Sequence, residues 1–361
     1  MATDDTGSTV LSPRENPSLL GHTDAESELL SAWKGGRFAH SWMITGPRGI
    51  GKATLAYRLA RFVLASGGSD LFGGPDSLSI GQDDPMFRRV ASYAHADLKV
   101  VERGFDTRRN RWREEILVSD VRDSVSFFAM TAAEGEWRVA IVDAADEMNR
   151  NAANALLKTL EEPPARGLVI MVAHVPGRVP ATLRSRCRRL SLRALAPELV
   201  SRILAEQRPD IAADKRAALG RLADGSPGRA LALADAGGLA LYEELVGLVS
   251  NLPTIDMLAV HRMGDRLNRR NGGGIFRLIA SLLTRWLEGM IRGAAVGAFP
   301  EPVVPGEDAA MARLARTGSL ERWCEVWENV RDLFSATDDA NLDRKQVLLN
   351  VFSTLQTTSR P

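Results

Sequence analysis

A glycine-rich segment near the amino terminus has the residue types of a phosphate-binding loop. The run from Gly46 to Ala53, GPRGIGKA, fits the pattern G-x-x-x-x-G-K-[ST] at every position except the last. In such a loop the backbone amides and the positive end of the following helix surround phosphate oxygens, and the lysine adds a positive charge. The sequence therefore predicts a nucleotide-binding site whose first part is formed by Gly46, Gly49, Gly51, Lys52, Ala53 and Thr54.

Two positions needed for ATP hydrolysis carry residues that cannot support it. The pattern places a hydroxyl after the lysine to ligate Mg²⁺, but Ala53 has none, and Thr54, one residue later on a helix, is turned by about 100°. A predicted strand ends in Asp143, whose carboxylate would act on the metal through water. Ala144 follows where a glutamate would polarise the attacking water, and Glu147 is a poor substitute. We therefore predict a degenerate site that requires no cofactor and at most holds ATP or ADP weakly, without hydrolysis.

A basic cluster, TLRSRCRR from Thr182 to Arg189, is a further candidate. The planar fork of an arginine stabilises the charge on a phosphoryl group in transfer, and an arginine supplied by a neighbouring subunit is worth roughly 10³–10⁵ in rate. The simpler interpretation of the same residues is a solvated, positively charged face. The residue types alone leave both interpretations open.

The composition is that of a globular protein with room for two or three domains. The 361 residues are 45% hydrophobic and 25% charged, and the formal net charge of +1 does not predict a binder of polyanions. The two cysteines, Cys187 and Cys324, lie far apart and outside any CxxC pair, so no disulfide framework and no zinc or other metal site is predicted. The start resembles no signal peptide and no apolar run is long enough for a membrane span, so we expect a cytoplasmic protein.

Alternating strands and helices should position these residues. Helical periodicity follows the loop, with Leu55 and Leu59 on its buried face, and recurs just before the two prolines at 163–164. Apolar runs predict strands directly before the loop and over Arg138–Asp146 and 167–174. An alternating pattern predicts a strand over Leu98–Arg103, and a last short strand is predicted over Arg188–Leu195. Strands that alternate with helices predict an α/β fold with a parallel sheet covered on both faces.

The pattern changes after about Ala196, where helical periodicity continues and no strand is predicted. We expect a disordered lead-in over residues 1–18, an α/β domain over 19–195, a small helical domain over 196–238 and a larger all-helical domain over 239–361. Residues 66–86 are rich in Gly, Asp, Ser and Pro and are expected to form a loop.

Two further motifs, taken together, resemble those of a known family. The run NALLKTLEEPP from Asn154 is followed by PATLRSRC from Pro180, and this pair is similar to the AAA+ clamp-loader family of bacterial DNA polymerase III. The resemblance covers residues 18 to 235 well and continues in pattern to the end of the chain. It implies that Ser185, Arg186 and Cys187 form the SRC motif, whose arginine reaches the ATP of the adjacent subunit.

Several departures from the active members of that family point the same way. His174 stands where they carry a sensor threonine, and Gly228, with Arg229 next to it, stands at the position of a sensor arginine. Residues 66–94 contain no cysteine, although many relatives have a four-cysteine zinc module there. His22 lies where the adenine pocket of the family begins. The resemblance therefore implies a subunit with the ATPase fold but without catalytic turnover of its own.

The resemblance also implies an assembly. The AAA+ P-loop module would be followed by a helical lid and an all-α collar, which joins the chain to motor subunits (gamma or tau) and to delta in a five-subunit ring. That hetero-oligomer would be part of the polymerase holoenzyme and would place the sliding clamp on primer–template DNA during DNA replication. No association with a membrane is expected. Arg186 would complete the ATP site of a motor subunit as an arginine finger.

Two other functions compete with this interpretation. One is a self-sufficient AAA+ ATPase in DNA replication or repair that uses Lys52 and Asp143 with an unorthodox base. The other is a P-loop kinase or a repair-associated AAA+ protein, which would not be expected to carry both the NALLKTLEEPP run and the SRC motif. Steady ATP turnover by the isolated chain would favour the first competitor.

Overall fold

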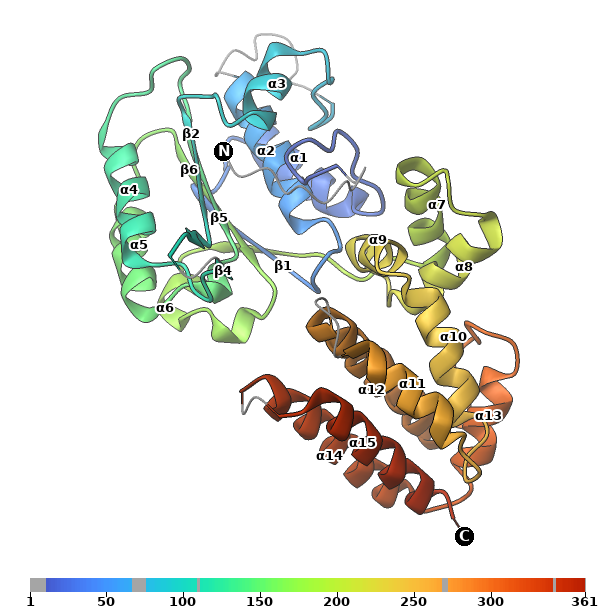
Figure 1. Cartoon of the computed structure of the whole chain (residues 1–361). Helices are drawn as coiled ribbons and strands as arrows, with labels where there is room; N and C mark the ends of the chain where they lie inside the picture. Colours follow the sequence, from blue (N-terminus) through green and yellow to red (C-terminus); the bar gives the residue numbers. More distant parts are fainter. Residues whose placement is uncertain (1–10, 67–75, 109–110, 268–271, 340–341, 361) are drawn as a thin grey trace. The chain divides into compact units, whose positions relative to one another are not determined.

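The computed structural model describes residues 11–66, 76–108, 111–267, 272–339 and 342–360 (Figure 1). These residues form two compact units. The first runs to Asp210 and also includes Asp224–Arg229, whereas the second holds Ile211–Ala223 and everything from Ala230 onward. None of the described helices is both long and apolar enough to cross a membrane.

The first unit is built on a five-stranded parallel sheet. Its strand order is β2-β5-β6-β1-β7, and every neighbouring pair runs parallel. The strands are β1 Ser41–Thr45, β2 Leu98–Glu102, β5 Arg138–Asp143, β6 Gly167–Ala173 and β7 Arg188–Ser191. The five predicted strands are therefore present, and the α/β fold class is confirmed.

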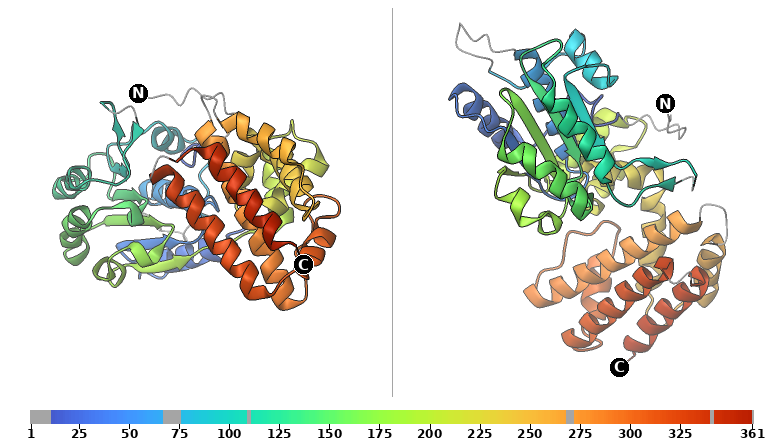
Figure 2. Two further views of the ribbon diagram at one scale, coloured as in Figure 1. Left: turned by 60° about the horizontal axis from the view of Figure 1, so that its bottom comes forward. Right: turned by 90° about the vertical axis from the view of Figure 1, so that its left-hand side faces the viewer.

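Helices cover both faces of this sheet (Figures 1 and 2). Side chains of β1 alternate between two cores: Trp42 and Ile44 belong to one, and Met43 belongs to the other. Because successive residues of a strand point to opposite faces, a strand buried on both sides is apolar throughout, as predicted. The first core includes α1 Thr23–Lys34 and α2 Lys52–Ser66, and the second includes α4 Val118–Ala129 and α5 Arg150–Glu161.

Shorter elements join this framework. The first unit also contains α3 Pro85–Ala91, the turn η1 Ala145–Glu147, the turn η2 Pro176–Arg178, α6 Ala181–Arg184 and α7 Pro197–Gln207. A small antiparallel sheet of two strands, β3 Phe105–Asp106 and β4 Arg111–Trp112, lies between β2 and α4 in the chain. The expected loop over 66–86 falls partly on residues 67–75, which lie outside the described residues.

Beyond β7 the described part of the chain forms helices and no further strand, as predicted. Trp286 and Trp323 are buried, and the rings of Phe276 and Phe334 meet edge to face at 5.4 Å, so the apolar stripes of these helices serve core packing. The domain limits at residues 195 and 238 stay predictions. The helices are α8 Ala213–Leu222, α9 Pro227–Asp235, α10 Gly238–Val249, α11 Met257–Leu267, α12 Gly272–Val296, α13 Glu307–Leu314, α14 Leu320–Asp339 and α15 Arg344–Thr358.

Part of the expected lead-in is fixed on the first unit. Residues 1–10 lie outside the described residues, but residues 11–18 differ from the expectation of disorder. Two arginines of α2 hold this segment: Arg58 donates to the carbonyl of Pro17 at 2.8 Å, and the buried Arg61 donates to those of Arg14 and Asn16, both at 3.1 Å. A buried guanidinium must find acceptors, and carbonyl groups of an irregular segment can supply them.

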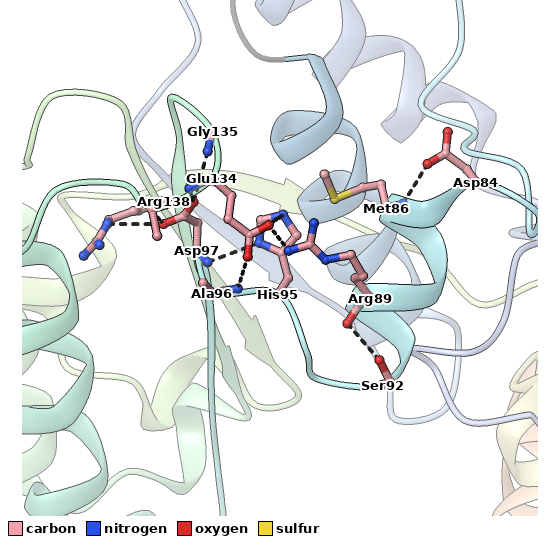
Figure 3. A network of polar contacts seen from close by, with 11 residues as sticks. Asp84, Met86, Arg89, Ser92, His95, Ala96, Asp97, Glu134, Gly135 and Arg138 are labelled. Atoms are coloured by element: carbon pink, nitrogen blue, oxygen red, sulfur yellow. Dashed lines mark hydrogen bonds and ion pairs between the residues drawn. The ribbon is translucent and has the colours of Figure 1, made fainter.

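A buried carboxylate fixes the start of β2 (Figure 3). Asp97 is fully buried and accepts hydrogen bonds from the backbone amides of Ala133, Glu134 and Gly135, at 2.8, 2.8 and 3.2 Å. The guanidinium of Arg138, at the start of β5, lies 3.6 Å from the same carboxylate. Asp97 thus joins the loop before β5 to the two strands that end in the acidic part of the candidate site.

We predict that Asp97→Ala lowers the free energy of unfolding by about 3 kcal/mol or more, because it leaves Arg138 as an uncompensated buried charge and three amides without an acceptor. Chemical denaturation followed by circular dichroism measures the change. Asp123→Ala, at an exposed position on α4, is the control and should stay within about 0.5 kcal/mol of the parent. Equal stability of the two variants would contradict the role given to Asp97.

Candidate functional site

The glycine-rich loop connects β1 to α2 and has the backbone of a tight phosphate loop. Gly46, Gly49 and Gly51 have φ values of 143°, 74° and 104°, a region that side-chain-bearing residues rarely adopt. A Cβ at Gly46 would lie 2.5 Å from the carbonyl oxygen of Leu192, so this glycine is also required by close packing. The predicted strand–loop–helix context of the loop is therefore present.

The lysine of the loop is turned onto the loop itself. Lys52 is buried, and its Nζ donates to the carbonyl oxygens of Gly46, at 2.7 Å, and Pro47. Burial lowers the pKa of Lys52 to about 8, against the opposing effect of Asp143 and Asp146. The ammonium group expected to meet phosphate is thus engaged by backbone carbonyls.

Residues 224–229, which belong to the same compact unit, pack directly on the loop. The amide of Gly228 donates to the carbonyl of Gly49 at 2.9 Å, and the hydroxyl of Ser226 donates to that of Arg48 at 2.8 Å. A Cβ at position 228 would lie 2.9 Å from the Cα of Gly49. The position assigned to a sensor arginine therefore admits only glycine, and the adjacent Arg229 pairs with Asp224 at 2.7 Å.

His22 contacts the loop from the segment before α1. The ring is buried, and its Nε2 lies 2.7 Å from the carbonyl oxygen of Ile50. Because a carbonyl can only accept, Nε2 carries the proton in this contact. His22 holds the loop backbone, so the same nitrogen cannot at the same time serve an adenine base.

The acidic side of the site lies at the ends of β2 and β5. Asp143 is the last residue of β5 and pairs in register with Glu102 of β2. Burial, together with the neighbouring Glu102, raises the pKa of Asp143 to about 6. The next residue, Ala144, is buried and offers no functional group.

Glu147, the only carboxylate considered as a substitute base, is held by two arginines. Its Oε1 accepts a hydrogen bond from Arg48 of the glycine-rich loop, and its Oε2 lies 2.7 Å from Nε of Arg103. Both oxygens are therefore occupied by guanidinium groups, an arrangement that favours a structural ion pair over proton abstraction. The surrounding cavity has a volume of about 320 Å³ and also touches Trp112 and His174.

His174, at the place of the sensor threonine, is a neutral imidazole. It follows the last residue of β6, and its backbone amide donates to Asp146 at 2.8 Å. Burial, together with the nearby Lys52 and Arg48, lowers its pKa to about 4. Its Nδ1 is buried and makes no hydrogen bond to the described residues.

These residues fit phosphate oxygens better than they fit the Mg²⁺ of a nucleotide. The loop amides and Lys52 could approach phosphate, whereas the residue after the lysine, Ala53, has no oxygen and Thr54 is buried in α2. On the metal side, Asp143 is the carboxylate at the expected position. Among the described residues there is no group of three or more His, Cys, Asp or Glu side chains that could hold a metal ion.

The SRC motif lies at the opposite end of the sheet. The hydroxyl of Ser41, the first residue of β1, donates to the carbonyl of Arg186 at 2.7 Å, and Arg188 pairs in register with Trp42. The glycine-rich loop begins after the last residue of β1, about 16 Å further along the strand direction at about 3.3 Å per residue. The side chain of Arg186 therefore cannot serve the loop of its own chain.

The guanidinium of Arg186 is exposed and oriented by neighbours. One nitrogen lies 2.6 Å from Oε1 of Glu161, the residue that ends α5, and another donates to the carbonyl of Thr182 at 3.0 Å. Ser185 donates to the same carbonyl at 3.2 Å. Cys187 is half-buried, and burial raises the pKa of its thiol to about 11, so it packs as a neutral group.

Sequence reasoning missed several contacts of this site. Arg48 and Arg103 were not singled out, although each binds Glu147, and Asp146 was not linked to His174. An arginine inside a glycine-rich loop was the one available signal, because its charge must find a partner nearby. The other contacts join segments far apart in the chain, which periodicity cannot pair.

The amino-terminal half of the chain matches a described protein family. Residues 21–196 fit the family "DNA polymerase III, delta subunit". A stretch of 195 residues is 33% identical to the DNA polymerase III subunit delta' of Pseudomonas aeruginosa and covers 54% of this chain and 56% of that protein. A second stretch is 31% identical to subunit tau of Salmonella typhimurium and covers 62% of this chain and 33% of that protein.

The chain spans about half the length, or less, of these curated relatives. Among solved structures, a gamma-subunit-related protein of Thermotoga maritima aligns with 92% of this chain and 100% of its own, at 15% identity and a TM-score of 0.39.

We predict that Ala53→Ser increases the affinity of the isolated chain for Mg-ADP about tenfold, because it restores a hydroxyl that can ligate the metal. We take this new contact to contribute about as much free energy as one charge-assisted hydrogen bond. Titration calorimetry with and without EDTA measures the change. The gain should vanish when the metal is removed. No gain in the presence of Mg²⁺ would contradict the metal explanation and indicate that the contacts of Lys52 and Ser226 keep the loop closed.

We also predict that nucleotide binding weakens above pH 8. The pKa of Lys52 lies at about 8 in the free protein, and a bound phosphate favours the charged amine, so binding above this pH requires proton uptake and loses affinity with rising pH. The affinity for ADP at pH 7.0, 8.5 and 9.5 measures this. Lys52→Arg keeps its charge throughout and should show a flatter profile. Parallel profiles would contradict the role of Lys52.

Proposed function

Because this chain belongs to the family of delta-prime subunits of DNA polymerase III, we propose that it is a non-hydrolysing clamp-loader subunit. In this role it donates Arg186 to the ATP site of a neighbouring motor subunit. It assists in loading the sliding clamp onto primed DNA during replication, and the assembly, not the isolated chain, turns over ATP.

One observation carries this proposal: the loop and the finger lie at opposite ends of one parallel sheet. Arg186 is level with the start of β1, whereas the loop follows its end. An arginine in that position can act only on a phosphate that another molecule brings to it. Its exposed, planar guanidinium suits the charge of a transferring phosphoryl group, where a finger is worth roughly 10³–10⁵ in rate.

Four positions carry residues that support the proposed absence of ATP hydrolysis at the chain's own loop. Ala53 and Ala144 lack the metal ligand and the base, Gly228 replaces a cation, and His174 is neutral. Glu147 is occupied by two arginines. Each of these positions would have to act on the same phosphate, so several independent losses affect one reaction.

The proposed partners follow from the relatives. Subunits tau of Salmonella typhimurium and Escherichia coli match 62% and 76% of this chain, which supports a shared architecture between this subunit and the motors beside it. We propose gamma or tau and the delta subunit as neighbours in a five-subunit ring, joined through the helices from α10 onward. The chain would then contact the sliding clamp and primer–template DNA as part of this complex.

A self-sufficient ATPase remains the competing function, because the three loop glycines and Lys52 are retained. The two functions differ in one measurement. The isolated chain with Mg-ATP and primed DNA should show no steady turnover if it is a finger donor. Turnover of the isolated chain that Lys52→Ala abolishes would favour the competitor.

We predict that Arg186→Ala slows ATP hydrolysis in the reconstituted complex and slows clamp loading with it. At the site that depends on Arg186 the rate should fall by roughly 10³–10⁵. The complex of this chain with delta and motor subunits is loaded with ATP, and primed DNA then triggers a single turnover. The loss appears as a smaller amplitude of the fast phase of ATP hydrolysis. Arg186→Lys should recover little, since it keeps the charge but not the planar fork.

The matched control is Arg184→Ala, an exposed arginine two residues earlier on the same segment. It should leave hydrolysis, loading and ring assembly unchanged. Arg186→Ala should also assemble normally, because the surface pair with Glu161 is worth only about 0–1 kcal/mol. An unchanged fast phase in Arg186→Ala, or an equal loss in Arg184→Ala, would refute the finger.

A further inference from the structure

The small sheet formed by β3 and β4 is a hairpin with an unusual surface. It is separate from the five-stranded sheet and extends from the first unit (Figure 2). Two-residue strands of this kind bury little by themselves. The hairpin therefore contributes little to the core, and its side chains are available for contacts outside it.

Its aromatic residues are the most exposed feature. Phe105 is 38% exposed and Trp112 is 52% exposed, and they are directly opposite each other in the antiparallel register. Their rings meet edge to face, with centroids 5.5 Å apart and planes at 79°. Cross-strand pairing and the edge contact fix the orientation of the indole, so a planar group can meet a pre-oriented ring at little entropic cost.

Arginines flank this pair. Arg108 and Arg111 are exposed, and Arg113 is 37% exposed on its side chain. The ion pairs of Arg111 with Glu114 and of Arg113 with Asp120 are long, at 3.6 and 3.7 Å. Solvated pairs at such distances are weak, so these arginines can exchange a carboxylate for a phosphate.

A hollow of about 590 Å³ lies beside the indole. It is lined by Arg108, Arg111, Trp112 and Arg113, together with the carboxylates of Asp106, Glu114 and Glu115. The alternation of cations and carboxylates does not suit a long polyanion track. It suits a short contact, in which one base stacks and the phosphates on either side meet single arginines. An acidic peptide fits less well, because it offers no planar group for the indole.

We propose that the β3–β4 hairpin is a binding site for single-stranded DNA, in which an unpaired base stacks on Trp112 and the flanking phosphates contact Arg108 and Arg111. Stacking on an exposed aromatic ring tolerates any base, because every base has a π face. Trp112 also touches the cavity around Glu147 and His174, whereas Arg108 and Arg111 line only the hollow beside the indole, which is where the proposed contacts lie. Only the choice of DNA over RNA rests on the function proposed above.

The test uses the full chain by itself and a fluorescein-labelled oligodeoxythymidylate at low salt. We expect Trp112→Ala to weaken binding at least about fivefold, the loss that removal of one stacked base produces. Trp112→Phe keeps a π face and should recover most of the affinity. Met130→Ala, at another exposed apolar side chain of the same unit, is the control and should bind like the parent.

The phosphate contacts have a test of their own. Arg111→Ala should reduce the slope of log affinity against log salt by about 0.7, the value for one phosphate contact on a single strand. Arg202→Ala is the matched control, because Arg202 is similarly exposed and also pairs with a glutamate on its own helix, at 3.7 Å. It should leave the slope unchanged.

Three outcomes would overturn the proposal. One is equal binding of the oligonucleotide by Trp112→Ala and the parent. The second is equal affinity for a blunt duplex with the same dependence on Trp112, which would exclude stacking on an unpaired base. The third is a Trp112-dependent affinity for poly-glutamate and none for DNA, which would identify an acidic protein as the ligand. Because Arg186 takes no part in this assay, its outcome does not depend on the finger.

Discussion

The parallel arrangement of the five strands is the constraint on which the candidate sites depend. Since all strands run in one direction, everything that follows a strand gathers at one edge of the sheet and everything that precedes a strand gathers at the other. The glycine-rich loop and His174 follow β1 and β6, and Asp143 is the last residue of β5. Arg186 precedes β7 and is tied to the start of β1. The chain therefore presents the glycine-rich loop on one edge of the sheet and Arg186 on the other.

The sequence predicted most of this framework, because buried parallel strands are apolar on both faces and stand out as short runs between helices. The runs before the loop and at Arg138 were identified for that reason, whereas the strand at Leu98 was identified by its alternation and the change to helices after Ala196 by helical periodicity. The hairpin of β3 and β4 was not predicted, because strands of two residues are too short to show the alternating pattern of a strand. Helix α4 was not predicted either: its buried positions, such as Val121 and Phe128, lie in a mixed sequence rich in Ser and Asp.

The site was predictable in its residue types and not in its contacts. Gly46, Lys52, Asp143 and Arg186 lie where the motif and the strands imply, but several contacts of the site join distant segments. Nothing local in the sequence pairs His22 with Ile50, or Gly228 with Gly49. The glycine at 228 illustrates the limit. As a motif position it is a lost arginine, and only the close approach of two backbones explains why no larger residue can stand there.

The hydrogen bonds of its carbonyls give the glycine-rich loop a structural role that does not depend on hydrolysis. Five successive carbonyl groups of the loop, those of residues 46–50, each accept a hydrogen bond from a side chain or from a backbone amide. None of these hydrogen bonds belongs to the regular pattern of a helix. The donors are Lys52 for residues 46 and 47, Ser226 for residue 48, Gly228 for residue 49 and His22 for residue 50. Gly46, Gly49 and Gly51 have positive φ values, so the backbone that presents these carbonyls favours glycine at these positions whether or not the loop takes part in catalysis. The loop then serves as a joint that holds the segment before α1 and residues 224–229 on the sheet.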